Sequence, residues 1–255
     1  MSIPLRNSWS ALLAVALAPG LLLAQRAAEA SHPWSYDGAH GPAQWGKLKP
    51  EYAVCKTGKH QTPIDIRNAK SADLPAIEFS YARSPFRIID NGHSVQVTPE
   101  PGNFITVGGW RYDLVQFHFH HPAEELIEGH PHPMVAHLVH KDADGKLAVV
   151  AVLLKSGQAN PFFEALWKSM PSDVEQEHTP EGAVVDLNQL LPTKHGYYTF
   201  AGSLTTPPCS EDVTWFVLKT VVNISKAEIA TFAAKYPHNA RPVQPLDGRM
   251  VQASR

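Results

Sequence analysis

The sequence predicts one mostly β domain in which a large sheet is wrapped by irregular loops. Three observations support this: β-type segments recur along the chain, helix signals are few, and 22 prolines and 16 glycines fit long loops. No internal repeat or low-complexity linker divides the chain. The expected strands are Phe86–Asp90, Ser94–Thr98, Phe104–Val107, Leu114–His121, Met134–His140, Leu147–Leu154, Tyr197–Gly202 and Val213–Thr220.

One of these strands is expected at the centre of the sheet. Leu147–Leu154 is apolar at every position, so it lacks the polar alternation of a strand with one solvated face. Two helices are predicted at the periphery. Asn160 caps a helix over Pro161–Met170, and Ser225 begins a capping box with Glu228 ahead of a second helix.

The N-terminal segment 1–30 has the pattern of a secretory signal. Arg6 precedes an apolar run from Ala11 to Ala24, and Ala28-Glu29-Ala30 is a small-x-small cleavage site. The run is short for a membrane span, although an uncleaved anchor is the alternative. We therefore expect a signal peptide over 1–30 and a single domain over 31–255.

Charge and cysteine content restrict the environment of the protein. The net charge is −2 with charged residues scattered, which gives no electrostatic case for binding nucleic acid or an anionic membrane. Cys55 and Cys209 are the only cysteines. In an oxidising compartment such a pair favours a disulfide, with two buried free thiols as the alternative.

Three histidines give the strongest functional signal. Side chains alternate between the faces of a strand, so His118 and His120 present two imidazoles on one side. The turn-rich stretch 122–133 then reverses the chain and brings His137 alongside on a neighbouring strand. Three neutral imidazoles with an open fourth position are typical of catalytic zinc, whereas structural zinc is closed by four protein ligands.

Two other interpretations of these histidines remain open. They are incidental core or surface histidines, or a loose histidine-rich tract that scavenges metal. Under the zinc interpretation, four further histidines of the region are dispensable for metal binding: His121, His130, His132 and His140.

Several short motifs occur in a fixed order around the histidines, from Trp34 to Gln244. They are W-S-Y at 34–36, G-P-A-Q-W at 41–45, Q-T-P-I-D-I at 61–66, N-G-H at 91–93, S-L-T-T-P-P-C at 203–209, W-F-V-L-K at 215–219 and N-A-R-P at 239–242. Together they resemble the alpha-class carbonic anhydrases of the bacterial, exported kind. The resemblance implies an α+β fold with a large, mainly antiparallel, twisted central sheet, a few short peripheral helices, and zinc at the foot of a cone-shaped cavity.

The resemblance also implies an activity. A carbonic anhydrase, or carbonate dehydratase, is a zinc lyase with one Zn²⁺ per chain that hydrates carbon dioxide reversibly to bicarbonate and a proton through a zinc-bound hydroxide. The zinc lowers the pKa of its water to about 7, the value known for this family. The small apolar substrate would meet a wall of residues at matching positions: Val139, Val149, Leu204, Thr206, Val213 and Trp215.

Motif positions imply roles for further residues. Thr205 accepts a hydrogen bond from the hydroxide and donates its own proton to Glu124, which orients the nucleophile. His93 matches the family's proton shuttle, since an exposed imidazole accepts and passes protons near neutral pH. The water chain that reaches it is lined by Tyr36, Asn91, Gln96 and Thr206.

The surroundings of the metal ligands depart from the family pattern. Gln116 is expected to accept from His118, as in the family. The glutamate that usually accepts from His137 is replaced by Val135, and the histidine that usually follows Glu124 is replaced by Glu125. We expect Glu125 to take over as the acceptor for His137; the alternative is that it points into solvent.

Two rival functions come from other classes. One is a carbonic-anhydrase-like binding module that has lost catalysis, although such relatives usually lack a zinc ligand. The other is a zinc esterase, since metal hydroxide also attacks activated carbonyls; esterase activity is also possible as a side activity. We expect a periplasmic or secreted monomer or homodimer that acts on a small molecule, with no nucleic acid and no membrane partner after signal cleavage.

Overall fold

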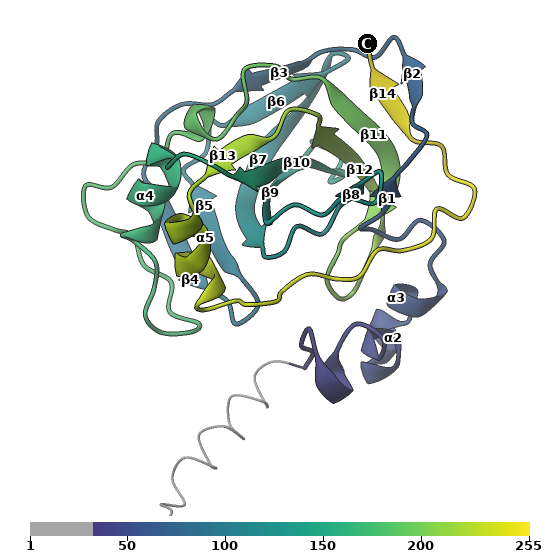
Figure 1. Cartoon of the computed structure of the whole chain (residues 1–255), viewed down its shortest axis with the longest axis horizontal. Coiled ribbons are helices and arrows are strands. Elements are labelled where there is room, and N and C mark those ends of the chain that lie inside the picture. Colours follow the sequence, from purple (N-terminus) through teal and green to yellow (C-terminus); the bar gives the residue numbers. More distant parts are fainter. Residues whose placement is uncertain (1–32) are drawn as a thin grey trace, which may run out of the picture. The chain divides into compact units, whose positions relative to one another are not determined.

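The structure, a computed structural model, describes residues 33–255, and Trp34–Arg255 form one compact unit. A twelve-stranded sheet dominates this unit (Figure 1). The predicted mostly β fold is confirmed. The signal peptide predicted over 1–30 lies outside the described residues. The main path of the sheet runs through β2 (Lys70–Ala72), β14 (Gln252–Ser254), β11 (Tyr197–Ser203), β12 (Glu211–Leu218), β10 (Leu147–Ser156), β9 (Met134–Lys141), β7 (Trp110–His120), β5 (Val95–Pro99) and β4 (Phe86–Asp90).

The remaining strands are short additions to this sheet or a separate pair. β13 (Val222–Ile224) pairs with β10, while β6 (Phe104–Val107) joins β7 to β3 (Ile77–Ser80). β1 (Asp65–Ile66) and β8 (Leu126–Ile127) form a two-stranded sheet of their own. Most pairs in the large sheet are antiparallel, and parallel pairing joins β10 to β12, β10 to β13 and β14 to β2.

β10 is buried on both faces, as its unbroken apolar sequence predicts. Ala148, Val150 and Val152 pack into the larger hydrophobic core on one face of the sheet. Val149 and Ala151 pack into a second, smaller core on the other face. The strand lies between β9 and β12, so its backbone groups are paired on both sides and no solvated face demands polar side chains.

All eight predicted strands are present, with boundaries shifted by a few residues at most ends. β7 begins at Trp110, four residues earlier than its apolar pattern indicates, because its first half is an exposed ribbon paired with β6. The strands that the sequence pattern missed have two to four residues each: β1, β2, β3, β8, β13 and β14. Segments this short have no periodicity to detect.

The two predicted helices are α4 (Pro161–Trp167) and α5 (Lys226–Ala233), and both caps form as expected. The Asn160 side chain accepts from the Phe162 amide, and Ser225 and Glu228 make the reciprocal capping box. Two one-turn helices, α2 (Trp45–Leu48) and α3 (Val54–Thr57), were not predicted. Within residues 33–255, three short 3₁₀ turns complete the helical elements: η1 (Gly38–His40), η2 (Pro50–Tyr52) and η3 (Leu187–Gln189).

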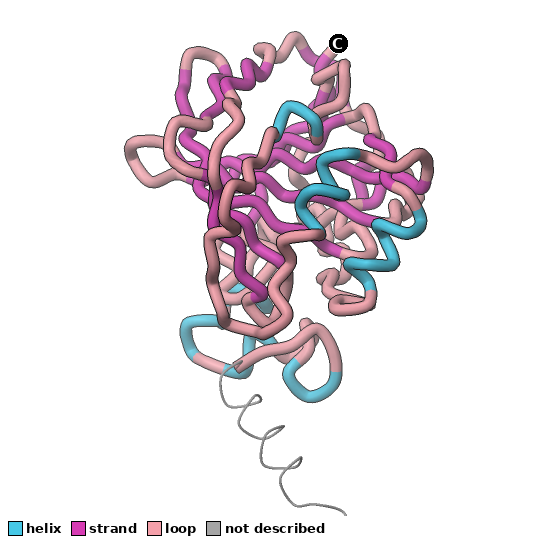
Figure 2. Tube along the Cα trace, turned by 90° about the vertical axis from the view of Figure 1, so that its left-hand side faces the viewer, coloured by secondary structure: helices cyan, strands magenta, loops and turns pink. Residues whose placement is uncertain are grey.

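The helices lie around the strands rather than among them (Figure 2). α4 and α5 lie side by side, with the Trp167 ring 5.7 Å from that of Phe232. No helix among residues 33–255 is long and apolar enough to cross a membrane. The face of the sheet opposite these helices, around the smaller core, carries the polar cluster described next.

Candidate metal centre

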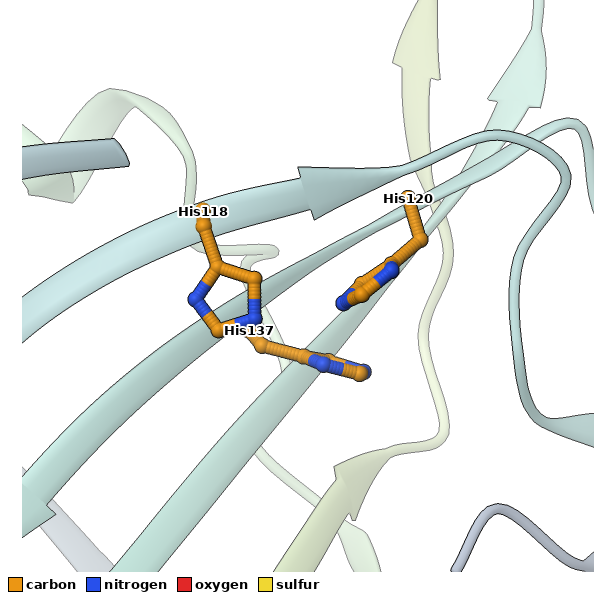
Figure 3. Close-up of side chains that lie close together, drawn as sticks. All are labelled: His118, His120 and His137. Atoms are coloured by element: carbon orange, nitrogen blue, oxygen red, sulfur yellow. The ribbon is translucent and has the colours of Figure 1, made fainter. Parts of the chain in front are cut away.

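The pleat and register of two central strands bring three imidazoles together. His118 and His120 are on the same face of β7, two residues apart. His118 lies directly opposite His137 in the antiparallel β7–β9 pair, so the third ring projects from the same face. In Figure 3 the three side chains point toward one another, and their ligand nitrogens lie within 4.8 Å of one another.

Each ring has one nitrogen held by a partner outside the cluster. His118 Nδ1 lies 2.9 Å from Gln116 Oε1, and His120 Nδ1 lies 2.7 Å from the Asn239 carbonyl. His137 Nε2 lies 2.9 Å from Glu125 Oε1. A neutral imidazole with an acceptor on one nitrogen carries its proton there and leaves a lone pair on the other. The inward-facing atoms are therefore the Nε2 atoms of His118 and His120 and the Nδ1 of His137.

This donor set fits a cation such as zinc. His120 Nε2 is buried and has no hydrogen-bond partner among the described residues. Such an orphan buried nitrogen is unfavourable unless something binds it. Burial, reinforced by His137, lowers the pKa of His118 to about 3, and burial lowers that of His120 well below its usual value. Both rings are thus neutral, the form that binds metal.

The third ring has different electrostatics. Burial acts to lower the pKa of His137, but the charge and hydrogen bond of Glu125, together with the charge of Glu124, outweigh it and raise that pKa above its usual value. A carboxylate partner on the outer nitrogen makes an imidazole a more basic ligand. His137 is therefore the ring of the three that is most strongly polarised toward a cation.

Comparison with known proteins assigns the family. Residues 40–255 match the family model described as eukaryotic-type carbonic anhydrase. The chain belongs to this alpha carbonic anhydrase family. A carbonic anhydrase of Pectobacterium carotovorum is 41% identical over 240 residues, which cover 94% of this chain and 98% of the relative.

Solved structures agree with the sequence comparison. A hyperthermostable carbonic anhydrase from a hydrothermal vent chimney superposes with a TM-score of 0.84 at 43% identity, covering 87% of this chain and all of the other. The alpha carbonic anhydrase of Thermovibrio ammonificans, solved with sulfanilamide, gives a TM-score of 0.83 at 40% identity, covering 86% and 98%. The activity of the chain is the reversible hydration of carbon dioxide, the reaction of this family of zinc enzymes.

The apolar residues expected to line the substrate site lie next to the histidines. Val139, Val149 and Trp215 are register partners across β9, β10 and β12. They form one row across the three strands. Val139, the member of the row on β9, is two residues from His137 and so lies on the same face. Val213 is also buried in the smaller core, and the partly buried Leu204 packs against that core. The Trp215 ring contacts the His137 ring edge-on at 4.9 Å.

Glu124 lies at the centre of the cluster. Its Oε2 is 3.6 Å from His120 Nε2 and 3.9 Å from His137 Nδ1, while its Oε1 accepts from the Arg241 amide at 2.7 Å. Burial raises the pKa of Glu124 to about 7, although His137, the Arg241 amide and the Thr205 hydroxyl act against that rise. Thr205 is buried beside the carboxylate.

Arg241 was given no role by the sequence pattern. It is buried, and its guanidinium donates to the carbonyls of Thr62 and Cys55 at 2.7 and 3.0 Å. Burial lowers its pKa to about 10, and Glu124 acts against that shift. Cys55 and Cys209 form the predicted disulfide. Arg241 therefore connects the disulfide-linked N-terminal segment to Glu124, a link that required the fold to be seen.

His93 lies in the expected turn between β4 and β5. Its ring stacks on Trp34 with centroids 3.6 Å apart and planes 9° apart. Asn91 Oδ1 accepts from the His93 and Ser94 amides, so this side chain shapes the turn itself. The other residues expected along the water chain, Tyr36, Gln96 and Thr206, are all partly exposed, and Gln96 is the register partner of His118.

The departure from the family pattern at His137 has a structural counterpart. Val135 is fully buried among apolar residues of the smaller core. Glu125, also fully buried, reaches His137 from the connection between β7 and β9. The histidines expected to be dispensable lie outside the cluster: His121 and His130 contact backbone carbonyls, His132 is partly buried, and His140 pairs with Tyr81.

Proposed function

We propose that the chain hydrates carbon dioxide at one zinc ion held by His118, His120 and His137. The observation that carries this proposal is the convergence of three imidazole nitrogens whose outer nitrogens are already committed to Gln116, Asn239 and Glu125. Three protein ligands leave a fourth position for water, which is the arrangement of catalytic rather than structural zinc. When bound, zinc lowers the pKa of a coordinated water to about 7, the value known for this family.

The apolar row explains how the site accepts its substrate. Carbon dioxide is small, electrophilic and without charge, so it needs a close apolar surface rather than charged groups. Val139, Val149 and Trp215 supply such a surface beside His137, with Val213 and Leu204 completing it. We assign these residues to substrate binding, and Thr206 to the polar edge. A small apolar surface of this kind disfavours a large ester as the physiological substrate.

Thr205 and Glu124 are assigned to orienting the nucleophile. Glu124 is an acceptor fixed by the Arg241 amide, so a hydroxyl that donates to Glu124 must turn its lone pairs toward the metal site. Thr205→Ala is expected to keep zinc and lower the hydration rate by roughly tenfold or more, because misoriented reactants lose rate steeply. Ser210→Ala, an exposed hydroxyl of the same loop, is the matched control. An unchanged rate in Thr205→Ala would remove this residue from the mechanism.

His93 is assigned to proton export. Its imidazole lies beside Trp34 and Tyr36 in a partly exposed turn, which suits exchange with buffer. His93→Ala is expected to lower hydration at low buffer concentration and to recover in imidazole buffer. A defect that imidazole does not relieve would reject the assignment. His130→Ala, an exposed histidine outside the cluster, controls for the loss of an imidazole.

Glu125 is assigned as the positioning partner of His137, in place of the strand glutamate that Val135 replaces. Losing such a partner typically costs 10–100-fold in metal affinity. Glu125→Ala should therefore release zinc to a chelator roughly 10–100-fold faster, whereas Glu128→Ala, an exposed glutamate of the same connection, should not. Adding Val135→Glu to Glu125→Ala should slow release again, because it returns a carboxylate to His137 from the strand. Equal release rates in wild type and Glu125→Ala would reject the assignment.

The cellular setting follows from the N-terminal segment and the disulfide. We propose that residues 1–30 are removed as a signal peptide, that 31–255 form the catalytic domain, and that the enzyme works in the periplasm or outside the cell. The Cys55–Cys209 bond supports an oxidising compartment. Mass spectrometry of the exported protein tests the cleavage site, and sedimentation distinguishes a monomer from a homodimer.

The decisive functional test compares two substrates on one zinc-loaded sample. Carbon dioxide hydration should far exceed hydrolysis of an activated ester. Ester hydrolysis alone would indicate an esterase, and zinc binding without either activity would indicate a binding module.

A further inference from the structure

Asn239 connects two parts of the site that lie far apart in the sequence. It follows α5 in the segment that runs toward β14, and it is buried at 1% exposure. Its carbonyl accepts from His120 Nδ1, and its amide donates to the His121 carbonyl at 3.0 Å. The backbone of Asn239 is thus docked against the end of β7, where the metal ligands His118 and His120 lie.

The Asn239 side chain reaches in a second direction. Its Oδ1 accepts from the His121 amide at 2.8 Å, and its Nδ2 donates to the Phe119 carbonyl at 3.0 Å and to the His93 carbonyl at 2.9 Å. A carboxamide nitrogen has two hydrogens, and here both are used. One buried amide therefore bonds the metal-ligand strand on one side and the His93 turn on the other.

Asn239 makes these bonds just beyond the point where the backbone pairing between β5 and β7 ends. β5 and β7 are register partners only at Gln96–His118 and Val97–Phe117. Beyond that point Ser94 Oγ contacts the Phe119 carbonyl at 2.6 Å, and Asn239 supplies the next contact, to His93. The side-chain oxygens of Asn91 and Asp90 also accept from amides within the turn, and these bonds shape the turn without reaching β7.

We propose that the Asn239 side chain is a positioning residue that fixes the His93 turn to strand β7, and so sets the separation between His93 and the metal ligands. The consequence for proton export rests on the shuttle role proposed for His93, whereas the anchoring itself does not. Because the Asn239 side chain is buried, its two N–H donors are shielded from water, and the bond to the Phe119 carbonyl is itself buried. Proton transfer through ordered water depends on the distance spanned, so a loosened turn affects proton export before it affects hydration chemistry.

The test uses the zinc-loaded enzyme and Asn239→Ala. The backbone carbonyl that accepts from His120 is retained in this variant, while all three side-chain bonds are lost. Amide hydrogen exchange in the 91–94 turn is expected to accelerate at least tenfold. The turnover number at low buffer is expected to fall roughly tenfold, since ångström-scale misplacement costs up to about 100-fold, while kcat/KM changes little and imidazole restores turnover.

Asn103→Ala is the matched control. Asn103 is 3% exposed, and its amide also ties a turn together, by bonds to Ala82, Ser84 and Glu100. The Asn103→Ala variant should loosen the turn that Asn103 holds and leave amide hydrogen exchange at 91–94 unchanged. Asn239→Ser replaces Asn239→Ala if the alanine variant does not fold.

Two results overturn the proposal. One is unchanged exchange at 91–94 in the Asn239 variant, whatever its activity. The other is a parallel fall in kcat and kcat/KM that imidazole does not relieve, because a general loss of active-site structure would produce it. If His93→Ala itself shows no defect in proton export, the shuttle assignment fails, and the exchange experiment still decides whether Asn239 anchors the turn.

Discussion

His137 and His140 lie on the same strand and are both buried, yet they face different environments. His137 faces the smaller core, where His118, His120 and Glu125 surround it. His140 lies on the opposite face in the larger core, with Nε2 2.8 Å from the Tyr81 hydroxyl. Burial lowers the pKa of His140 to about 4, whereas Glu125 raises that of His137. Strand parity, rather than residue type, separates the histidine in the candidate metal cluster from the one packed in the larger core.

Replacing His137 is expected to have the largest effect. His137→Ala removes a ligand from a three-ligand site, so zinc affinity should fall by more than the roughly 10–100-fold that a lost outer partner costs, and hydration should be lost with it. His140→Leu should keep both zinc affinity and hydration activity. Zinc content after dialysis and stopped-flow hydration measure the two properties on the same samples. Full activity in His137→Ala would abolish the contrast between the two histidines.

Reducing the disulfide is expected to have the next largest effect, on stability and on the metal-site side of the sheet. The Cys55–Cys209 bond closes a loop of 154 residues, and losing such a bond typically costs about 2–5 kcal/mol. Arg241 bonds the Cys55 carbonyl, and its amide holds Glu124, so the loss should reach the active site. Urea unfolding with and without reductant measures it. Two thiols that are alkylatable in the native exported protein would contradict the bond.

A smaller effect is expected from acid, which should lower the free energy of unfolding through His140 in the larger core. His140 in the unfolded chain binds a proton below about pH 6.5, but in the folded state only below about pH 4. Between these values the unfolded state holds more protons, so the free energy of unfolding decreases as pH falls, by up to about 3 kcal/mol. Unfolding free energies at pH 7.5 and 4.5 for wild type and His140→Leu test this. The variant should show a shallower pH dependence, and equal dependences would contradict the assignment.

The smallest expected effect concerns the Tyr81–His140 hydrogen bond. His140→Leu leaves the buried Tyr81 hydroxyl without its partner, which costs about 1–3 kcal/mol. Combining it with Tyr81→Phe should recover part of that loss, since removing both partners leaves no unsatisfied group. A double-mutant cycle by urea unfolding measures the coupling. Strictly additive losses would show that the two side chains do not interact.

The strand pattern predicted the cluster of three histidines, and the long apolar segments predicted the core. His118, His120 and His137 follow from the two-residue period and a reversing turn, as β10 follows from its unbroken apolar run. Asn239 and Arg241 could not be predicted in the same way, because their bonds join segments more than a hundred residues apart that no local pattern relates. The two-residue strands β1 and β8 were also missed, since they form only by pairing with each other.

Glu125 was partly predictable from the sequence. Its sequence position indicated a replacement for the acceptor missing at Val135, but only the folded connection between β7 and β9 shows its Oε1 2.9 Å from His137 Nε2. The resemblance to the family identified which acceptor was missing. The geometry identified which residue stands in its place.

The most direct test of this account is stopped-flow carbon dioxide hydration through a cycle of chelation and zinc repletion, with zinc measured on the same samples. We predict that wild type loses activity on chelation and regains it with one equivalent of zinc, while His120→Ala regains none at that ratio. Hydration that persists in zinc-free protein, or full recovery in His120→Ala, would contradict the assignment of the three histidines as the catalytic metal site.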